Sequence, residues 1–269
     1  MMGVINITPN SFSDGGEFTS RETFLEQFKK LQALGVQIFD LGAESTAPFN
    51  QPISSELEWQ RLSPMIECLF KESALKSSDS ISIDTYKFDV FKQAYALIRS
   101  FDESIRVIWN DVSGKLEDEV LDFLDAHNFE LVISHNLSPK RSLTSEHMNF
   151  CADKIDLVDY FSRISNTLED RGLSSKCLFD PCFGFSKTLE QNYELLSTMD
   201  TWLDGQYRWV IGVSRKSFLQ KLCFGDDKIK ESELIHTSLL SKWMRSFSDR
   251  SITIRLHDPS VFLSAQLVK

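Results

Sequence analysis

Residues 4–16 read VINITPNSFSDGG, an apolar strand that runs directly into a small, polar loop ending in two glycines. The same transition from a short apolar run to polar residues recurs along the whole chain. Polar groups at the carboxyl ends of successive strands are what a parallel barrel with one active-site face requires. The other transitions lie at 40–46, 82–87, 109–114, 178–181, 212–216 and 254–258.

Eight short apolar runs, many of them β-branched, predict strands, and the segments between them have helical spacing. The mean repeat of about 34 residues is the usual size of one βα unit. We therefore predict an α/β fold, a single (β/α)8 TIM-barrel domain over residues 1–269 with its active site at the C-terminal ends of the strands. The predicted strands are 3–7, 36–41, 80–84, 105–109, 130–134, 177–180, 208–213 and 252–256.

Helix signals fill the gaps between these strands. Residues 23–34 place apolar side chains on one face and Gly35 supplies the stop, while Ser54 offers an N-cap to the next helix. Residues 136–153 are polar and predict a long loop, and residues 224–231 read as a charged insert before the seventh barrel helix. Further helices are predicted at 116–124, 155–168, 189–199 and 234–244.

The composition is ordinary for a globular protein, with 42% hydrophobic and 25% charged residues. Acidic residues exceed basic ones by 39 − 29 = 10, which argues against nonspecific nucleic-acid binding, because such binding needs a basic surface. The five cysteines form no CxxC pair, so we expect reduced thiols and a cytoplasmic protein. No apolar run approaches about 20 residues, so no membrane span is expected. The chain starts almost on its first strand, as would a domain excised from a longer or bifunctional chain.

Four polar residues near strand ends are equipped to hold a planar, nitrogen-rich heterocycle. Asp84 and Asp180 can each accept two hydrogen bonds from an amidine-like group. Asn110 can donate and accept at once, and Lys216 adds a cation. Each has a simpler interpretation, since a single Asp that ends a strand is often a helix cap and Lys216 could belong to a solvated first turn.

A second set, Asn6, Arg255 and His257, suits a diphosphate. The last and first strands become neighbours when a barrel closes. Arg255 can fork onto phosphate oxygens, His257 adds a donor, and the side-chain oxygen of Asn6 can ligate Mg²⁺. Arg255 and His257 could equally be a structural pair, but polar residues recur at so many strand ends that a shared site is favoured. His135 is interpreted as structural rather than catalytic, and Cys182 as a packing residue.

In these motifs the chain resembles dihydropteroate synthase of folate biosynthesis, over nearly its whole length. The motifs at 3–16 and 212–217 are specific, and the order and spacing of the full set argue against chance. The resemblance rests on residues 3–16, 40–46, 83–87, 110–114, 180–188, 212–217 and 255–258.

The resemblance implies a TIM-barrel transferase, usually a homodimer and a sulfonamide target. It would join 6-hydroxymethyl-7,8-dihydropterin diphosphate to 4-aminobenzoate. The family pattern makes Asp84, Asp180, Lys216, Arg255 and His257 catalytic. It assigns Asn110 with Asp84, Asp180 and Lys216 to the pterin, and Asn6, Arg255 and His257 to the diphosphate and its Mg²⁺. It also makes Gly212 a substrate-binding residue. It assigns the aminobenzoate site to Thr46, Pro48, Phe185, Lys216 and Ser217.

The chain also departs from the family pattern, in ways that affect rate and aminobenzoate affinity more than pterin binding. Ala47 stands where an Arg is common, and Asn10 where an Asp is usual. Cys182 and Ser186 replace glycines, and Asn136 replaces a Met.

Two other functions share part of this pattern. A pterin-dependent methyltransferase domain would have the same barrel and pterin pocket, but the 5–16 loop and the Arg255/His257 pair argue for diphosphate chemistry. A degenerate pterin-binding or regulatory protein is suggested by Ala47. An assay of labelled aminobenzoate incorporation discriminates all three.

Overall fold

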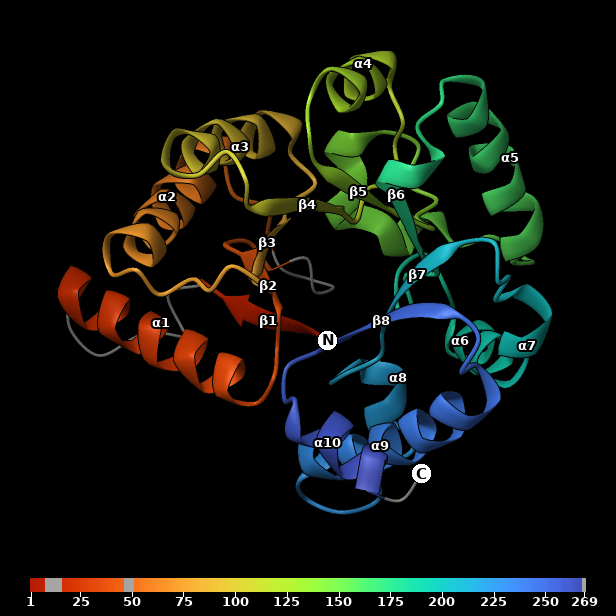
Figure 1. Ribbon diagram of the computed structural model, residues 1–269. Coiled ribbons are helices and arrows are strands. Elements are labelled where there is room, and N and C mark those ends of the chain that lie inside the picture. Colours follow the sequence, from red (N-terminus) through yellow and green to blue (C-terminus); the bar gives the residue numbers. More distant parts are fainter. Residues whose placement is uncertain (8–15, 46–50, 268–269) are drawn as a thin grey trace.

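Eight parallel strands, paired in sequence order, close into a barrel in the computed structural model, which describes residues 1–7, 16–45 and 51–267. Helices form a ring around the strands (Figure 1), so the prediction of a TIM barrel is confirmed. The strands are β1 Met2–Asn6, β2 Ile38–Gly42, β3 Ser80–Asp84, β4 Arg106–Asp111, β5 Glu130–Ser134, β6 Cys177–Asp180, β7 Arg208–Gly212 and β8 Ser251–Leu256.

Two helix boundaries lie at signals read from the sequence, whereas α3 and α10 were not among the predicted helices. Ser54 caps α2 by accepting a hydrogen bond from the Leu57 N–H at 3.2 Å, and Gly35 has a φ of +81° just after α1. The helices are α1 Gly16–Ala33, α2 Ser55–Lys71, α3 Phe88–Phe101, α4 Asp118–Ala126, α5 Leu157–Asp170, α6 Leu189–Ser197, α7 Met199–Trp202, α8 Ser217–Gln220, α9 Lys228–Ser246 and α10 Ser260–Leu267, with short 3₁₀ segments η2 Arg141–Phe150 and η3 Ser174–Lys176.

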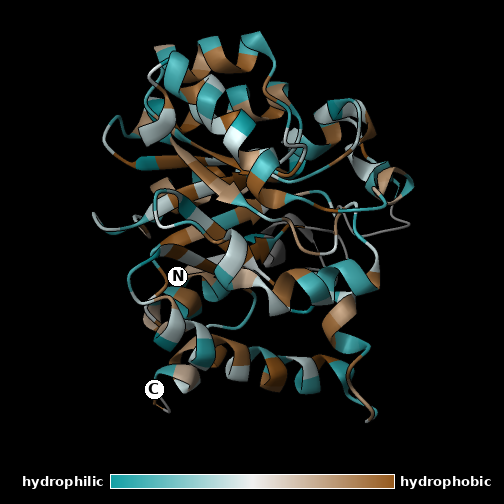
Figure 2. Ribbon diagram, turned by 90° about the vertical axis from the view of Figure 1, so that its right-hand side faces the viewer, coloured by the Kyte–Doolittle hydropathy of each residue, from teal (hydrophilic) through white to brown (hydrophobic). Residues whose placement is uncertain are grey.

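The barrel interior changes from apolar to polar along its axis. Successive residues of a strand point to opposite sides, so every second residue faces inward. Asp40, Ser82 and Asn110, each two residues or fewer from the end of its strand, bring buried polar groups into the interior. Figure 2 shows hydrophobic colour concentrated on the central strands. The apolar cluster inside the barrel is Met2, Ile38, Ile108, Val132, Leu178 and Val210.

Two segments differ from the sequence-based expectation. Within residues 136–153, expected as loop, η2 forms a 3₁₀ segment, and the Thr144 hydroxyl bonds the Arg141 carbonyl at 2.8 Å inside it. The expected insert at 224–231 is partly helix, because Asp227 caps α9 by accepting from the Lys230 N–H at 3.0 Å. In both segments polar side chains bond the local backbone, and such residues look like loop in a sequence.

All five cysteines lie in the described part of the chain and are free, as expected. Within that same part, every helix is too short or too polar to cross a lipid bilayer.

Candidate active site

A cavity of about 330 Å³ opens at the C-terminal ends of the strands. It collects every predicted site residue that the structure describes, from six strands and the segments that follow them. Thr46 and Pro48, like Ala47, lie outside the described residues. The predicted residues that line the cavity are Asn6, Asp84, Asn110, Asp180, Phe185, Gly212, Lys216, Ser217, Arg255 and His257.

Strand register explains why these side chains meet. Asn6 is level with Gly42, Gly42 with Asp84, and Asp84 with Asn110 across the first four strands. Gly42 leaves room in this row, because a Cβ there would lie 3.4 Å from the Asp84 carboxylate. The row therefore presents one polar edge to the cavity.

Asp40 supports the site from inside the barrel, and the sequence analysis gave it no role. It is fully buried, and its carboxylate accepts from Arg255 Nε at 2.6 Å, Ser82 Oγ at 2.6 Å and Asn110 Nδ2 at 3.0 Å. A buried polar side chain needs such hydrogen-bond partners, because burial without them costs free energy. The available signal was an acid at the centre of the apolar strand Ile-Phe-Asp-Leu-Gly.

Arg255 bridges two carboxylates rather than standing free. Its Nε bonds Asp40, and its Nη2 bonds Asp84 at 2.6 Å, which leaves Nη1 without a bond among the described residues. Burial opposes the charge, but Asp40 and Asp84 raise the pKa of Arg255 above its ordinary value, so it stays a cation. Burial raises the pKa of Asp84 to about 7, although Arg255 opposes the rise and Asp40 adds to it.

Asn110 and Asp180 each keep an acceptor for a ligand. Asn110 Oδ1 is buried and has no hydrogen-bond partner among the described residues, although Nδ2 of the same amide is bound to Asp40. Asp180 Oδ1 accepts from the Cys182 N–H at 2.7 Å, which leaves Oδ2 for another donor. Burial raises the pKa of Asp180, and the Cys182 hydrogen bond opposes the rise. An orphaned buried acceptor calls for a donor from a ligand.

Lys216 and Phe185 form another part of the cavity wall. The Lys216 ammonium lies 4.6 Å from the centre of the Phe185 ring, within the range of a cation–π contact. Burial lowers the pKa of Lys216. The other side of the Phe185 ring stacks on His147 of η2, with ring centres 4.1 Å apart. Ser217 is exposed at the start of α8.

Lys187 fixes the loop that carries Phe185. It is 1% exposed, and its ammonium lies within 3.1 Å of the carbonyls of His135, Cys182 and Phe185 and of His135 Nδ1. Cys182 and Ser186 in this loop have φ of +54° and +51°, where a side chain costs energy. Burial, with Lys187 adding, lowers the pKa of His135 to about 2, so His135 packs as a neutral ring.

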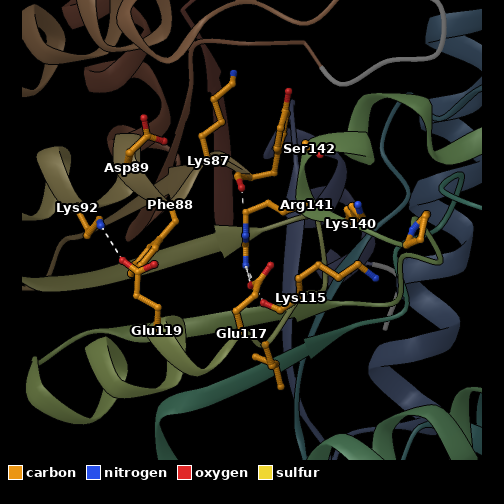
Figure 3. A pocket seen from close by; sticks show the side chains of 13 residues that line it. Lys87, Phe88, Asp89, Lys92, Lys115, Glu117, Glu119, Lys140, Arg141 and Ser142 are labelled. Carbon is orange, nitrogen blue, oxygen red and sulfur yellow. Dashed lines mark hydrogen bonds and ion pairs between the residues drawn. The ribbon is translucent and has the colours of Figure 1, made fainter.

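A larger hollow of about 1010 Å³ lies beside the site, over the loops that follow β3, β4 and β5. Two of its cations pair with acids that line it: Arg141 bonds Glu117 at 2.7 Å and Lys92 bonds Glu119 at 3.0 Å (Figure 3). Arg141 also bonds Asp111 at 2.6 Å. The smaller cavity is therefore the candidate active site, because it alone of the two contains the polar strand ends.

Comparison with known proteins agrees with this geometry. A family model described as pterin binding enzyme matches residues 2–245. A dihydropteroate synthase of Streptococcus pyogenes is 33% identical over 87% of this chain and 81% of its own length. One from Synechocystis is 32% identical over 82% of this chain and 73% of its own.

Solved structures agree as well. A Clostridium difficile dihydropteroate synthase, solved in the presence of pteroic acid, has a TM-score of 0.79 and 29% identity over 99% of this chain and 94% of that one. A Xanthomonas albilineans dihydropteroate synthase with 4-aminobenzoic acid has a TM-score of 0.76 and 26% identity over 99% of this chain and 90% of that one. By its sequence and its barrel, this chain belongs to the pterin-binding enzyme family, in the company of the dihydropteroate synthases.

Proposed function

We propose that the protein is a dihydropteroate synthase, which joins 6-hydroxymethyl-7,8-dihydropterin diphosphate to 4-aminobenzoate and releases pyrophosphate. The observation that carries the proposal is the convergence of ten predicted residues on one cavity at the strand ends. The cavity has an acidic and amide end, formed by Asp84, Asn110 and Asp180, and a cationic end near Arg255. These two ends match the heterocycle and the diphosphate of a single substrate.

The pterin would bind at the acidic end. Asp180 Oδ2 and Asn110 Oδ1 both lack partners among the described residues, and the ring presents N–H donors along one edge. Asp84, whose pKa is raised to about 7 by burial, can share a proton with the ring rather than only accept one. Lys216 would lie over the junction between pterin and aminobenzoate.

The diphosphate would bind at the other end, where Arg255 offers Nη1. Asn6 ends β1 at the cavity, and an amide oxygen together with phosphate oxygens is a ligand set that suits Mg²⁺. No cluster of three or more His, Cys, Asp or Glu that could hold a metal occurs among the described residues, so the ion would arrive on the substrate. When bound, Mg²⁺ would neutralise charge on the leaving diphosphate.

The chain's own residues would then favour breakage of the C–O bond and attack by the amine. Arg255 stabilises negative charge as it develops on the leaving oxygen, and it is already held in place by Asp40. The carbon left behind is an electron-poor methylene, which the pterin and the negative charge of Asp180 stabilise. The neutral aniline nitrogen attacks it and needs placement more than activation. Phe185, Lys216 and Ser217 would frame the aminobenzoate.

The test is incorporation of radiolabelled aminobenzoate into a pterin product. We expect incorporation that requires the pterin diphosphate and falls at least about a hundredfold in Arg255→Lys, because Lys cannot bridge two carboxylates and a phosphate. Arg106→Lys is the matched control, since Arg106 lies at the opposite end of the barrel in an exposed ion pair with Glu130. Tight pterin binding without incorporation would favour the regulatory alternative, and methyl transfer from a pterin the methyltransferase one.

We also propose that the protein is a cytoplasmic homodimer. Five free thiols fit a reducing compartment. Apolar side chains are exposed around the start of α9, with Phe224 fully exposed and Leu234 at 63%. Light scattering should give twice the mass of one chain, and Leu234→Glu should lower that mass. Fractionation of the source cells should place the protein with cytoplasmic markers.

A further inference from the structure

A chain of hydrogen bonds leads from His257 away from the cavity and into α9. Ser214, which is buried just after β7, has its Oγ 3.2 Å from Nδ1 of His257 and 3.2 Å from the backbone N of the same residue. The same Oγ lies 3.2 Å from Glu233 Oε1. Glu233 belongs to α9, which runs alongside α8 and α10 (Figure 1). The sequence analysis assigned no role to Ser214 or Glu233.

The acidic end of this chain can only accept hydrogen bonds. Arg215 Nε donates to Glu233 Oε1 at 3.1 Å, and His236 Nδ1 lies 3.4 Å from Oε2. Burial opposes ionisation, but hydrogen bonds from His236, Arg215 and Ser214 hold the pKa of Glu233 below its ordinary value. A carboxylate has no proton to give, so the Ser214 hydroxyl donates to Glu233.

The direction in which the Ser214 hydroxyl donates its proton determines which ring nitrogen of His257 is protonated. Ser214 has one hydroxyl proton, and Glu233 takes it, so its lone pairs accept from His257, both from the backbone N–H and from Nδ1–H. Burial lowers the pKa of His257 to about 3, and Arg255 and Arg215 add to the effect, so the ring is neutral. The other ring nitrogen, Nε2, then carries no proton.

We propose that Glu233 and Ser214 are positioning residues that hold His257 as the Nδ1–H tautomer and present its bare Nε2 to the diphosphate. The identity of that ligand rests on the proposed function. A bare ring nitrogen only accepts, so it pairs with a phosphate oxygen that still carries a proton. The site would thus select the substrate whose terminal phosphate keeps one proton. This reverses the sequence-based expectation that His257 is a donor.

The charges around His257 are consistent with this role. Arg255 comes from β8, Arg215 and Lys216 follow β7, and Glu233 comes from α9. The three cations already supply the attraction for an anion, so His257 need not be charged for the diphosphate to bind. Asp258 follows His257 in the chain, and Asn6 of β1 lines the same cavity as His257.

The tautomer can be read directly from the protein without any substrate. In protein labelled with ¹⁵N-histidine, a protonated and a bare ring nitrogen have clearly different NMR shifts, and His257→Asn identifies the signals of interest. We expect a protonated Nδ1 and a bare Nε2 for His257 at neutral pH. A protonated Nε2 would overturn the proposal. This readout does not depend on activity, so it stands even if the proposed function fails.

A variant of Glu233 should invert the arrangement. In Glu233→Met the side chain no longer accepts from Ser214, which frees the hydroxyl to donate to Nδ1 and moves the ring proton to Nε2. By calorimetry with inorganic pyrophosphate in chelator, we expect wild-type affinity to fall about tenfold as the probe loses its last proton, roughly the loss of one hydrogen bond. Glu233→Met should lose about twofold or less over the same pH range.

Glu231→Met is the matched control, because Glu231 lies on the same helix and bonds the Phe224 and Gly225 N–H groups instead of Ser214. It should follow the wild type. Equal pH dependence in the wild type and in Glu233→Met would overturn the proposal.

Discussion

The Ser186 hydroxyl lies 3.3 Å from Asn136 Oδ1, so two residues at which this chain departs from the pattern of the resembled family are in contact. Ser186 Oγ also accepts from the Leu137 N–H at 3.1 Å, and its one proton has two acceptors within reach, Asn136 Oδ1 and the His147 carbonyl at 3.1 Å. Asn136 Nδ2 donates to the Val112 carbonyl at 2.8 Å. This polar link ties together the loops after β4, β5 and β6, behind the ring of Phe185.

The link predicts that Ser186 and Asn136 are energetically coupled. Ser186→Gly removes the strain of a positive φ, but it also removes the acceptor of the Leu137 N–H and the one proton that the hydroxyl donates. Asn136→Met leaves the His147 carbonyl as the remaining acceptor for that proton. We expect each single variant to be destabilised by about 1 kcal/mol and the double variant by less than the sum. Urea unfolding of all four proteins gives the coupling energy. Strict additivity would mean that the contact contributes nothing.

Lys187 is predicted to hold the aminobenzoate wall in shape. Lys187→Met removes a donor from three backbone carbonyls, of which the Cys182 carbonyl keeps the Phe185 N–H, and this should lower the free energy of unfolding at neutral pH by about 2 kcal/mol. Because the loop carries Phe185, the KM for aminobenzoate should rise while pterin affinity stays near wild type. A matched loss of both affinities would instead indicate general disruption of the barrel.

The same residue predicts a pH dependence of stability. Burial lowers the pKa of Lys187 to about 8, whereas a lysine in the unfolded chain titrates near about 10.4. Between these values the unfolded state binds more protons, so stability rises with pH across that window. The difference in unfolding free energy between wild type and Lys187→Met should therefore increase from about pH 8 to about pH 10. A constant or shrinking difference would contradict the assignment.

Asp180 is predicted to bind the N–H edge of the pterin. Asp180→Asn retains an Oδ1 for the Cys182 N–H, so the loop should survive while the free oxygen is replaced by an amide donor. We expect at least a tenfold loss of pterin affinity by calorimetry, about 1.4 kcal/mol. Asp156→Asn is the control, because Asp156 caps α5 through a similar bond to the Asp159 N–H at 3.0 Å. Unchanged affinity in Asp180→Asn would remove the residue from the pterin site.

A metal prediction follows from Asn6. If Asn6 shares a diphosphate-bound Mg²⁺, EDTA should abolish turnover and added Mg²⁺ should restore it, while ligands that contain only the pterin bind equally well in both conditions. Asn6→Ala should raise the Mg²⁺ concentration needed for half-maximal rate. Full activity in chelator would exclude this role for Asn6.

Ala47 gives a prediction from the sequence alone, because it lies outside the described residues. An Arg is common there in the resembled family, and Lys187 or Arg61 could have replaced its charge. Lys187 is buried against four acceptors, so it is ruled out as the substitute. Arg61 remains, and its Nη1 bonds the Ala43 carbonyl at 3.1 Å. Ala47→Arg should raise kcat/KM for aminobenzoate by about tenfold or less, with pterin binding unchanged. No gain would point to compensation by Arg61.

The strands and the location of the site could be predicted because both follow from local patterns. Ser80–Asp84 and Cys177–Asp180 are short apolar runs that end in an acid, and their bounds agree with the prediction to the residue. A parallel barrel then brings such ends together whatever lies between them. The predicted residues therefore line one cavity because the barrel topology places these strand ends side by side.

Partnerships between distant residues could not be predicted in the same way. Arg255 was expected to face a phosphate, yet it also bonds Asp40, which is 215 positions away in the chain. Ser214 and Glu233 are common polar residues whose meaning comes only from their contact with each other and with His257. Such contacts depend on side-chain direction and burial, which hydrophobic periodicity does not encode.

The bond between Arg255 and Asp40 has a consequence for how the protein can change. Strands β1 and β8 are paired at two positions, Met2 with Arg255 and Gly3 with Leu256, so the strand pairing that closes the barrel is short. Arg255 reinforces it by reaching across to β2 and β3. Arg255 therefore both strengthens the closure of the barrel and forms part of the proposed anion site. Substitutions selected by an inhibitor should therefore leave Arg255 and Asp40 unchanged. They should occur in the loops at the rim of the cavity, where a substitution does not weaken the closure of the barrel.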